Sequence, residues 1–196
     1  MMHAVTPFSP PGNHTLSRRR FLRLGTLTMI AGLTPHLALA HTQGPARFER
    51  AVDLYNTHTG ESLSMPYWAD GHYIPEVLDQ YNYLLRDHHT DEVMTIDPQL
   101  LDLLYTIGEI TEMHETVNVV SAYRSYTTNV RLRERGVGVA RNSLHVHGKA
   151  VDIRTPGHNL RLIRRVALAL ELGGVGYYPR ANFLHIDAGP ARSWVR

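Results

Sequence analysis

The chain has 196 residues, of which 43% are hydrophobic and 19% are charged. These are ordinary values for a soluble globular protein, so they exclude a wholly disordered chain and a polytopic membrane protein, and the length favours one domain or at most two. The sequence contains no cysteine, which excludes disulfides, thiolate nucleophiles, iron–sulfur clusters and thiolate-bound zinc. Any metal must therefore be held by nitrogen and oxygen ligands.

The first forty residues differ in composition from the rest. They contain four arginines and no acidic residue, and an apolar stretch over Leu24–Ala40 ends in the sequence Ala-Leu-Ala, an A-x-A cleavage pattern. The basic run Ser17–Arg23 resembles the twin-arginine export signal. We therefore predict a twin-arginine-type signal peptide over residues 1–40 and a mature domain over residues 41–196. A retained signal anchor is the alternative, but the apolar run is short for a membrane span.

The formal charge of +2 for the whole chain depends on this leader. Without residues 1–40, 16 basic residues face 18 acidic ones, and the net charge becomes −2. No strongly basic composition remains to indicate a nucleic-acid partner. We expect no nucleic-acid binding and no stable membrane insertion once the leader is removed.

In chain order, hydrophobic periodicity and turn residues predict an alternation of short strands and amphipathic helices. The predicted elements are a strand over 51–55, a turn over 56–60, a strand or extended arm over 67–73, a helix over 75–86, a helix from 97 to about 114, a strand over 117–122, a helix over 127–135, a strand over 149–154, a helix over 159–170, and strands over 175–178 and 183–187. Asp97 is a good N-cap for the second helix. The pattern predicts a single domain of mixed α+β class.

Three polar side chains lie near the predicted C-terminal strands. His145 lies in a loop before the strand that carries Asp152, and a tight turn near Gly148 is needed to bring the two side chains together. In the last strand, His185 and Asp187 alternate with apolar residues and so share one face. Two imidazoles and one carboxylate around one point would suit catalytic zinc, with the fourth position left for water. The alternative is that a histidine and an aspartate at this spacing are ordinary polar surface residues.

The pattern S-x-H-x-x-G-x-A-x-D over residues 143–152, followed by Phe183-x-His185, resembles the zinc peptidase family of bacterial D-Ala-D-Ala carboxypeptidases and dipeptidases. Within it, the murein endopeptidase K branch is the most similar. Further segments that look like this branch are residues 54–61, 96–98, 121–125, 173–179 and 189–194. The resemblance implies a small, mainly antiparallel sheet flanked by helices, as in D-Ala-D-Ala metallopeptidases and the hedgehog signalling domain, with one zinc ion on the sheet.

The resemblance also implies residue roles. His145, Asp152 and His185 would be the zinc ligands, and Arg124 would lie at the metal, bind the substrate and stabilise the oxyanion. A guanidinium suits that task because it stays charged and offers a fork of donors to a developing negative charge. Ser143 would hydrogen-bond the ligands or the substrate, or would only cap its loop.

This chain departs from the family pattern at the position of the general base. Dipeptidases of the family carry Glu three residues before the last ligand, where this chain has Asn182, which cannot accept a proton at neutral pH. Asp187 is the first candidate for the catalytic base, with a carboxylate that only orients a zinc histidine as the alternative. His147 is the second candidate, and it would otherwise bind substrate at the mouth of the cleft.

The resemblance implies an exported, periplasmic zinc peptidase that hydrolyses amide bonds in the stem-peptide crosslinks of peptidoglycan. Two alternatives stay open: a D-amino-acid carboxypeptidase that trims stem peptides, and a non-catalytic, zinc-stabilised module that binds peptidoglycan. A zinc carrier is disfavoured because His88-His89 is too short for a His-rich tract.

Overall fold

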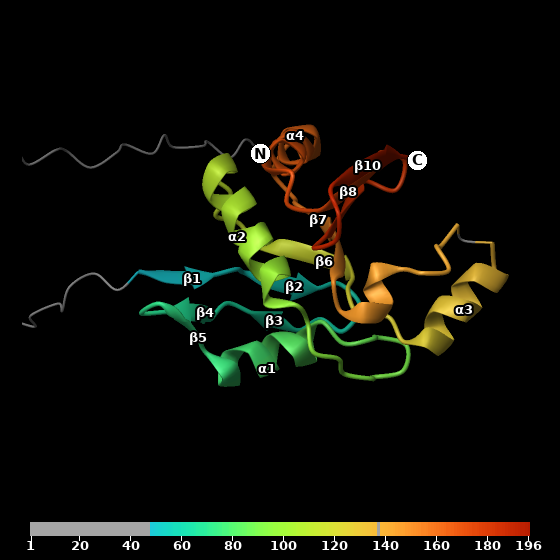
Figure 1. Ribbon diagram of the computed structural model, residues 1–196, viewed down its shortest axis with the longest axis horizontal. Helices are drawn as coiled ribbons and strands as arrows, with labels where there is room; N and C mark the ends of the chain where they lie inside the picture. Colours follow the sequence, from blue (N-terminus) through green and yellow to red (C-terminus); the bar gives the residue numbers. More distant parts are fainter. Residues whose placement is uncertain (1–47, 137) are drawn as a thin grey trace, which may run out of the picture. The chain divides into compact units, whose positions relative to one another are not determined.

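A seven-stranded mixed sheet forms the centre of the described part of the computed structural model, which comprises residues 48–136 and 138–196 (Figure 1). The strand order is β10-β8-β9-β7-β6-β2-β3. The strands are β2 (Leu54–Asn56), β3 (Ser62–Leu63), β6 (Val117–Ser121), β7 (Ala150–Arg154), β8 (Gly174–Tyr178), β9 (Phe183–Asp187) and β10 (Arg192–Val195). The β10–β8 and β2–β6 pairs are parallel and the other pairs are antiparallel, which confirms the mainly antiparallel sheet. The predicted signal peptide lies outside the described residues.

A second sheet joins β1 (Glu49–Ala51), β4 (Pro66–Ala69) and β5 (His72–Tyr73). The single strand expected over residues 51–55 is therefore wrong: β1 and β2 belong to different sheets and are separated by Val52 and Asp53. The side chain of Tyr81 is the physical reason for this break between the two strands. The Tyr81 hydroxyl donates to the Val52 carbonyl over 2.7 Å and accepts from the Val52 N–H, so a phenol takes the place of a neighbouring strand.

The helices follow their predicted positions closely. They are α1 (Pro75–Leu84), α2 (Pro98–Thr111), α3 (Tyr126–Glu134) and α4 (Leu160–Leu170). The Asp97 side chain accepts the Gln99 N–H over 3.1 Å, so the expected N-cap is confirmed. Within residues 48–136 and 138–196, no helix has the length and apolar character needed to cross a membrane.

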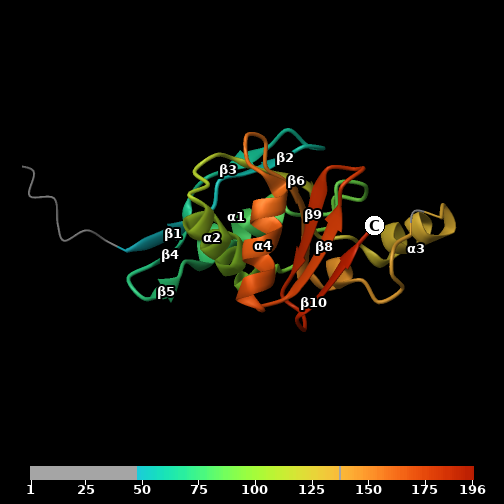
Figure 2. The same ribbon diagram turned by 90° about the horizontal axis from the view of Figure 1, so that it is seen from above.

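Helix α4 packs against β8 and against β9, the strand that carries His185 (Figure 2). Ile163 and Ala167 of α4 are buried in one core cluster with Leu184 and Ile186 of β9. Because side chains alternate along a strand, His185 must lie on the face of the sheet turned away from α4. The apolar residues of β9 thereby determine which face of the sheet carries the chemistry.

The segment Leu144–His147, expected from the sequence to be part of a loop, forms a short 3₁₀ helix, η1. Gly148 ends it in the left-handed region, at φ 63°, and its N–H bonds to the His145 carbonyl. The turn predicted at Gly148 is confirmed. His145 and His147 both lie in this 3₁₀ helix, where the two-residue period of a strand does not apply.

Candidate metal centre

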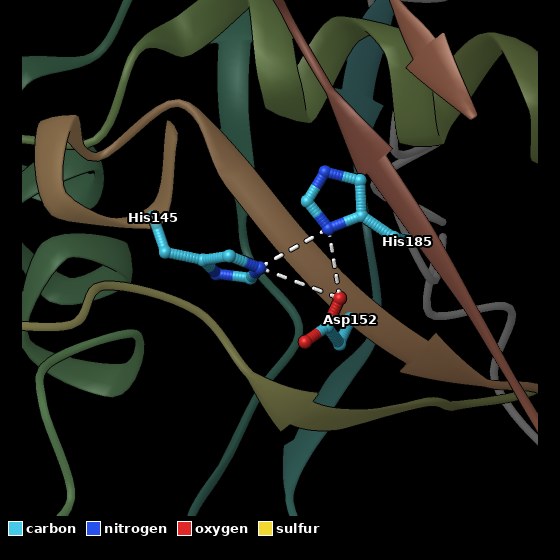
Figure 3. A group of neighbouring side chains, drawn as sticks. All are labelled: His145, Asp152 and His185. Atoms are coloured by element: carbon cyan, nitrogen blue, oxygen red, sulfur yellow. Dashed lines mark hydrogen bonds and ion pairs between the residues drawn. The ribbon is translucent and has the colours of Figure 1, made fainter. Parts of the chain in front are cut away.

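His145, Asp152 and His185 converge on one point, although they come from η1, β7 and β9 (Figure 3). Each offers one ligand atom, and these atoms all lie within 4.8 Å of one another. His145 Nε2 lies 3.1 Å from His185 Nδ1, and Asp152 Oδ1 lies 2.9 Å from His185 Nδ1. All three side chains are buried. The convergence expected from the sequence is therefore present.

The register of the sheet produces this convergence. Asp152 pairs directly with His185 across β7 and β9, and residues opposite each other in an antiparallel pair have Cβ atoms about 5 Å apart on one face. His145 is brought to the same point by the left-handed turn at Gly148. An added Cβ at Gly148 would lie 2.5 Å from the Thr95 carbonyl oxygen, so the turn has no room for a side chain.

The hydrogen bonds behind the two histidines fix the orientation of each ring. His145 Nδ1 lies 2.6 Å from the Ala122 carbonyl, which can only accept, so the ring donates from Nδ1 and Nε2 carries a lone pair. His185 Nε2 donates to Asp187 Oδ2 over 2.9 Å, and His185 Nδ1 lies 2.9 Å from Asp152 Oδ1 on the other side of the ring. His145 Nε2, His185 Nδ1 and Asp152 Oδ1 thus face one another in a buried cluster.

The pKa shifts of His185 and Asp152 favour a positive charge beside the Asp152 carboxylate. Burial lowers the pKa of His185, but hydrogen bonds to Asp152 and Asp187 outweigh it and the net shift is upward. Burial would raise the pKa of Asp152, yet its charge and hydrogen-bond interactions with His145 and His185 lower it. Two imidazole nitrogens and one carboxylate oxygen fit a zinc ion with an open coordination position.

Arg124 lies beside the cluster. It follows β6, its side chain is buried, and its Nη2 donates to Ser121 Oγ over 3.1 Å and lies 3.9 Å from Asp152 Oδ2. Burial lowers the pKa of Arg124, and the negative charges of Asp152 and Asp87 oppose that shift. The Arg124 N–H also donates to the His145 carbonyl over 3.1 Å, which couples the arginine loop to η1.

A cavity of about 440 Å³ opens on this group. Its lining includes Arg124, Ser143, all three residues of the cluster, and an aromatic and basic wall from β8 and β10. Ser143 precedes η1 without a side-chain capping bond, so its capping alternative has no support. Among the described residues, Asp152 is the only carboxylate that lines this cavity.

The two candidates for the general base lie elsewhere. His147 is exposed and does not line the cavity. Asp187 is completely buried behind the His185 ring. Its Oδ1 accepts the N–H groups of Gly174 and Gly189, and both oxygens accept from the Arg192 guanidinium, over 3.0 and 2.7 Å. Of the two roles left open for Asp187, these contacts favour orientation of His185.

Sequence reasoning missed strand β10, which forms part of the cavity wall. Strand β10 pairs in parallel register with β8, with Arg192 opposite Gly174 and Trp194 opposite Gly176. An added Cβ at Gly176 would lie 2.5 Å from the Trp194 ring. Glycines at alternate positions of β8 pair with large residues at alternate positions of β10. This complementary alternation is the sequence signal that predicts the packing.

An α+β domain with a His–Asp–His cluster on its central sheet is the architecture that the sequence resemblance implies. Comparison with known proteins gives the same result. Residues 45–194 match the family described as peptidoglycan L,D-endopeptidase MepK. The chain is 42% identical over 178 residues to peptidoglycan L,D-endopeptidase MepK of Escherichia coli K12, which covers 91% of this chain and 97% of that protein. It is 36% identical over 179 residues to a probable peptidoglycan L,D-endopeptidase MepK of Haemophilus influenzae, with 91% and 95% covered.

The chain therefore belongs to the MepK family of peptidases.

Proposed function

We propose that this protein is an exported, zinc-dependent peptidoglycan endopeptidase that hydrolyses amide bonds in stem-peptide crosslinks. The observation that carries the proposal is the set of three ligand atoms that converge beside Arg124 at the wall of a cavity. The names of the relatives, peptidoglycan L,D-endopeptidases, support the substrate class.

In this proposal, His145 Nε2, His185 Nδ1 and Asp152 Oδ1 hold one zinc ion per chain. When bound, zinc supplies a Lewis acid that polarises the scissile carbonyl and lowers the pKa of a water molecule. Burial of the three side chains keeps the site in a low-dielectric environment, which strengthens every charge interaction there.

The protein's own side chains bind and orient the substrate. The Arg124 guanidinium faces the cavity and donates to the oxygen of the scissile carbonyl as negative charge develops there. Asp187 accepts the Nε2 proton of His185, so that Nδ1 would be the ring atom that binds zinc. Ser143 contributes a hydroxyl to the cavity wall near the substrate.

A buried carboxylate holds the Arg124 loop in place. Asp87 Oδ2 accepts the N–H of Ser125 over 2.8 Å, immediately after Arg124 in the chain, and its Oδ1 accepts the His89 N–H over 2.9 Å. The Tyr123 N–H donates to the Leu85 carbonyl on the other side. In the proposed mechanism, Asp87 is a positioning residue that keeps the guanidinium aimed at the cavity.

The leader belongs to the same proposal. Residues 1–40 act as a twin-arginine-type signal peptide, residues 41–196 form the peptidase domain, and the mature protein works in the periplasm. The support is the arginine-rich, acid-free composition followed by the A-x-A pattern, together with a substrate class that is found in the cell envelope.

The test is digestion of purified crosslinked muropeptides by residues 41–196 with one equivalent of zinc, with and without a chelator. We expect chelator-sensitive conversion of dimers to monomers, and the product masses identify the bond. Asp152→Ala is the matched control, since it removes a ligand and leaves Arg124 in place. Release of a terminal D-amino acid from intact dimers would assign the protein to carboxypeptidases. Tight binding of muropeptides without products would assign it to binding modules.

A further inference from the structure

One polar group in the cavity has no role in the mechanism above: the hydroxyl of Tyr178. Tyr178 is the last residue of β8 and lines the cavity together with Arg124 and His185. It lies two residues beyond Gly176, which pairs with His185. Because side chains alternate along a strand, Tyr178 shares the face of the sheet that carries the candidate metal centre, whereas Tyr177 lies on the other face.

The packing around Tyr178 fixes the position of its ring. Phe183 of β9 stacks on it, with ring centroids 4.3 Å apart and an interplanar angle of 13°. Trp194 of β10 lies over Gly176, where the absence of a side chain makes room for the indole. The Trp194 ring is also 5.1 Å from the His185 ring, so the aromatic wall is continuous with the metal centre.

The direction of one hydrogen bond shows that the Tyr178 oxygen accepts and leaves its proton free to donate. Trp194 Nε1 lies 3.0 Å from Tyr178 Oη. An indole N–H can only donate, so the phenol oxygen accepts and its own proton must point elsewhere. Arg124 interacts electrostatically with Tyr178, but a guanidinium offers no acceptor. Within residues 48–136 and 138–196, no protein acceptor takes the Tyr178 proton.

We propose that Tyr178 is a second catalytic donor, whose O–H hydrogen-bonds the oxygen of the scissile carbonyl alongside Arg124 as negative charge develops on it. The proposal rests on the function proposed above. The hydroxyl keeps its proton throughout and acts through a fixed dipole, which Trp194 has already oriented before the substrate arrives. Donors that need no reorganisation contribute most in a buried site.

Tyr178→Phe tests the proposal, because it removes only the hydroxyl and keeps the stack on Phe183. We expect kcat on muropeptide dimers to fall by roughly 100-fold, the usual loss of one oxyanion donor, with KM and zinc content unchanged. Tyr177→Phe is the matched control. It removes the same atom from the neighbouring residue on the opposite face, and we expect wild-type kinetics.

Trp194→Phe separates an oriented donor from a general effect on packing. We expect a smaller loss of kcat than for Tyr178→Phe, and no additional loss when the two changes are combined, since the indole acts through the hydroxyl. Additive losses would overturn the orientation step. An unchanged kcat, or a rise in KM alone, in Tyr178→Phe would overturn the catalytic role while leaving the proposed function intact.

A binding measurement makes the test independent of turnover. A phosphinate analogue of a stem-peptide amide carries a tetrahedral, negatively charged centre. The affinity of the zinc-loaded protein for it should fall in Tyr178→Phe by the same factor as kcat/KM, while the affinity for an uncleaved product peptide stays constant. If the wild-type protein neither cleaves dimers nor binds the phosphinate, both proposals fail together. Equal phosphinate affinity in wild type and Tyr178→Phe rejects only the role of the tyrosine.

Discussion

The three buried aspartates around the site differ in what their oxygens contact. Asp152 faces the two histidines and the cavity, Asp187 lies behind His185, and Asp87 lies behind the loop of Arg124. Burial acts to raise the pKa of each carboxyl, and in each case hydrogen bonds reverse the shift, together with charge interactions with neighbouring histidines at Asp152 and Asp187. Each therefore stays ionised, and its neighbours determine its role.

Asp187→Asn distinguishes the two roles considered for that residue. The amide oxygen can still accept from His185, but it cannot balance the charge of Arg192 or strengthen the basicity of the ring. We expect zinc affinity to fall by about 10- to 100-fold, as for other changes behind a metal ligand, in a titration against a chromophoric chelator. Glu76→Gln, an exposed change in α1, is the control. Wild-type zinc affinity with lost activity would instead support a general base.

Asp87 gives a prediction for acid stability. Hydrogen bonds from Thr128, His89 and Ser125 outweigh burial and lower its pKa from 3.8 to about 2. A carboxyl with a depressed folded-state pKa stabilises the native state above its unfolded pKa, and this contribution is lost as the pH falls through the folded value. The shift corresponds to about 2 kcal/mol. Urea unfolding of wild type and Asp87→Asn should therefore show a gap at pH 7 that narrows between pH 4 and 2. A gap that does not change with pH would contradict the assignment.

At the scale of elements, the register of β7 against β9 connects the core to the site. Val151 and Ile153 of β7 pair with Ile186 and Leu184 of β9, and these four residues are buried in the core. A shift of one residue in the pairing of β7 with β9 would turn the polar side chains toward the core and the apolar side chains away from it. The hydrophobic effect that excludes such a slip therefore also keeps Asp152 opposite His185.

Gly148→Ala tests the turn between η1 and β7. A non-glycine residue in the left-handed region costs about 1 kcal/mol, and here the new Cβ would also meet the Thr95 carbonyl oxygen. Gly60 has a similar φ of 75° with nothing within 4 Å of an added Cβ, so Gly60→Ala measures the backbone cost alone. We expect a larger loss of unfolding free energy, and weaker zinc binding, in Gly148→Ala only. Equal losses in the two variants would show that the contact with Thr95 relaxes freely.

Periodicity predicts the elements that are long or amphipathic. The apolar stripe of α2, the β-branched run of β6 and the alternation in β9 each identify their element, and the S-x-H-x-x-G-x-A-x-D pattern identifies the cluster. What sequence reasoning misses depends on tertiary contacts. Val52 interrupts a strand because Tyr81 bonds its backbone, and β10 exists because glycines in β8 accommodate its large side chains. Neither partner is near in sequence.

At the scale of the whole molecule, the proposed leader changes the charge of the protein as well as its destination. Removal of residues 1–40 takes the net charge from +2 to −2. We expect the mature protein recovered from the periplasm to begin at His41, as measured by intact mass. Replacement of Arg18 and Arg19 by lysine should leave the full-length chain inside the cell. Normal export of the lysine variant would assign the leader to another route.

The ladder that holds Asp152 opposite His185 has a consequence for metal choice. The β7–β9 pairing fixes the separation of Asp152 and His185, but a set of two imidazoles and one carboxylate does not by itself reject copper, which binds nitrogen and oxygen ligands more tightly than zinc does. Discrimination must then come from which ion is abundant where the chain folds. Under the twin-arginine route proposed above, the chain would cross the membrane already folded, so the identity of the bound ion would be decided in the cytoplasm before export.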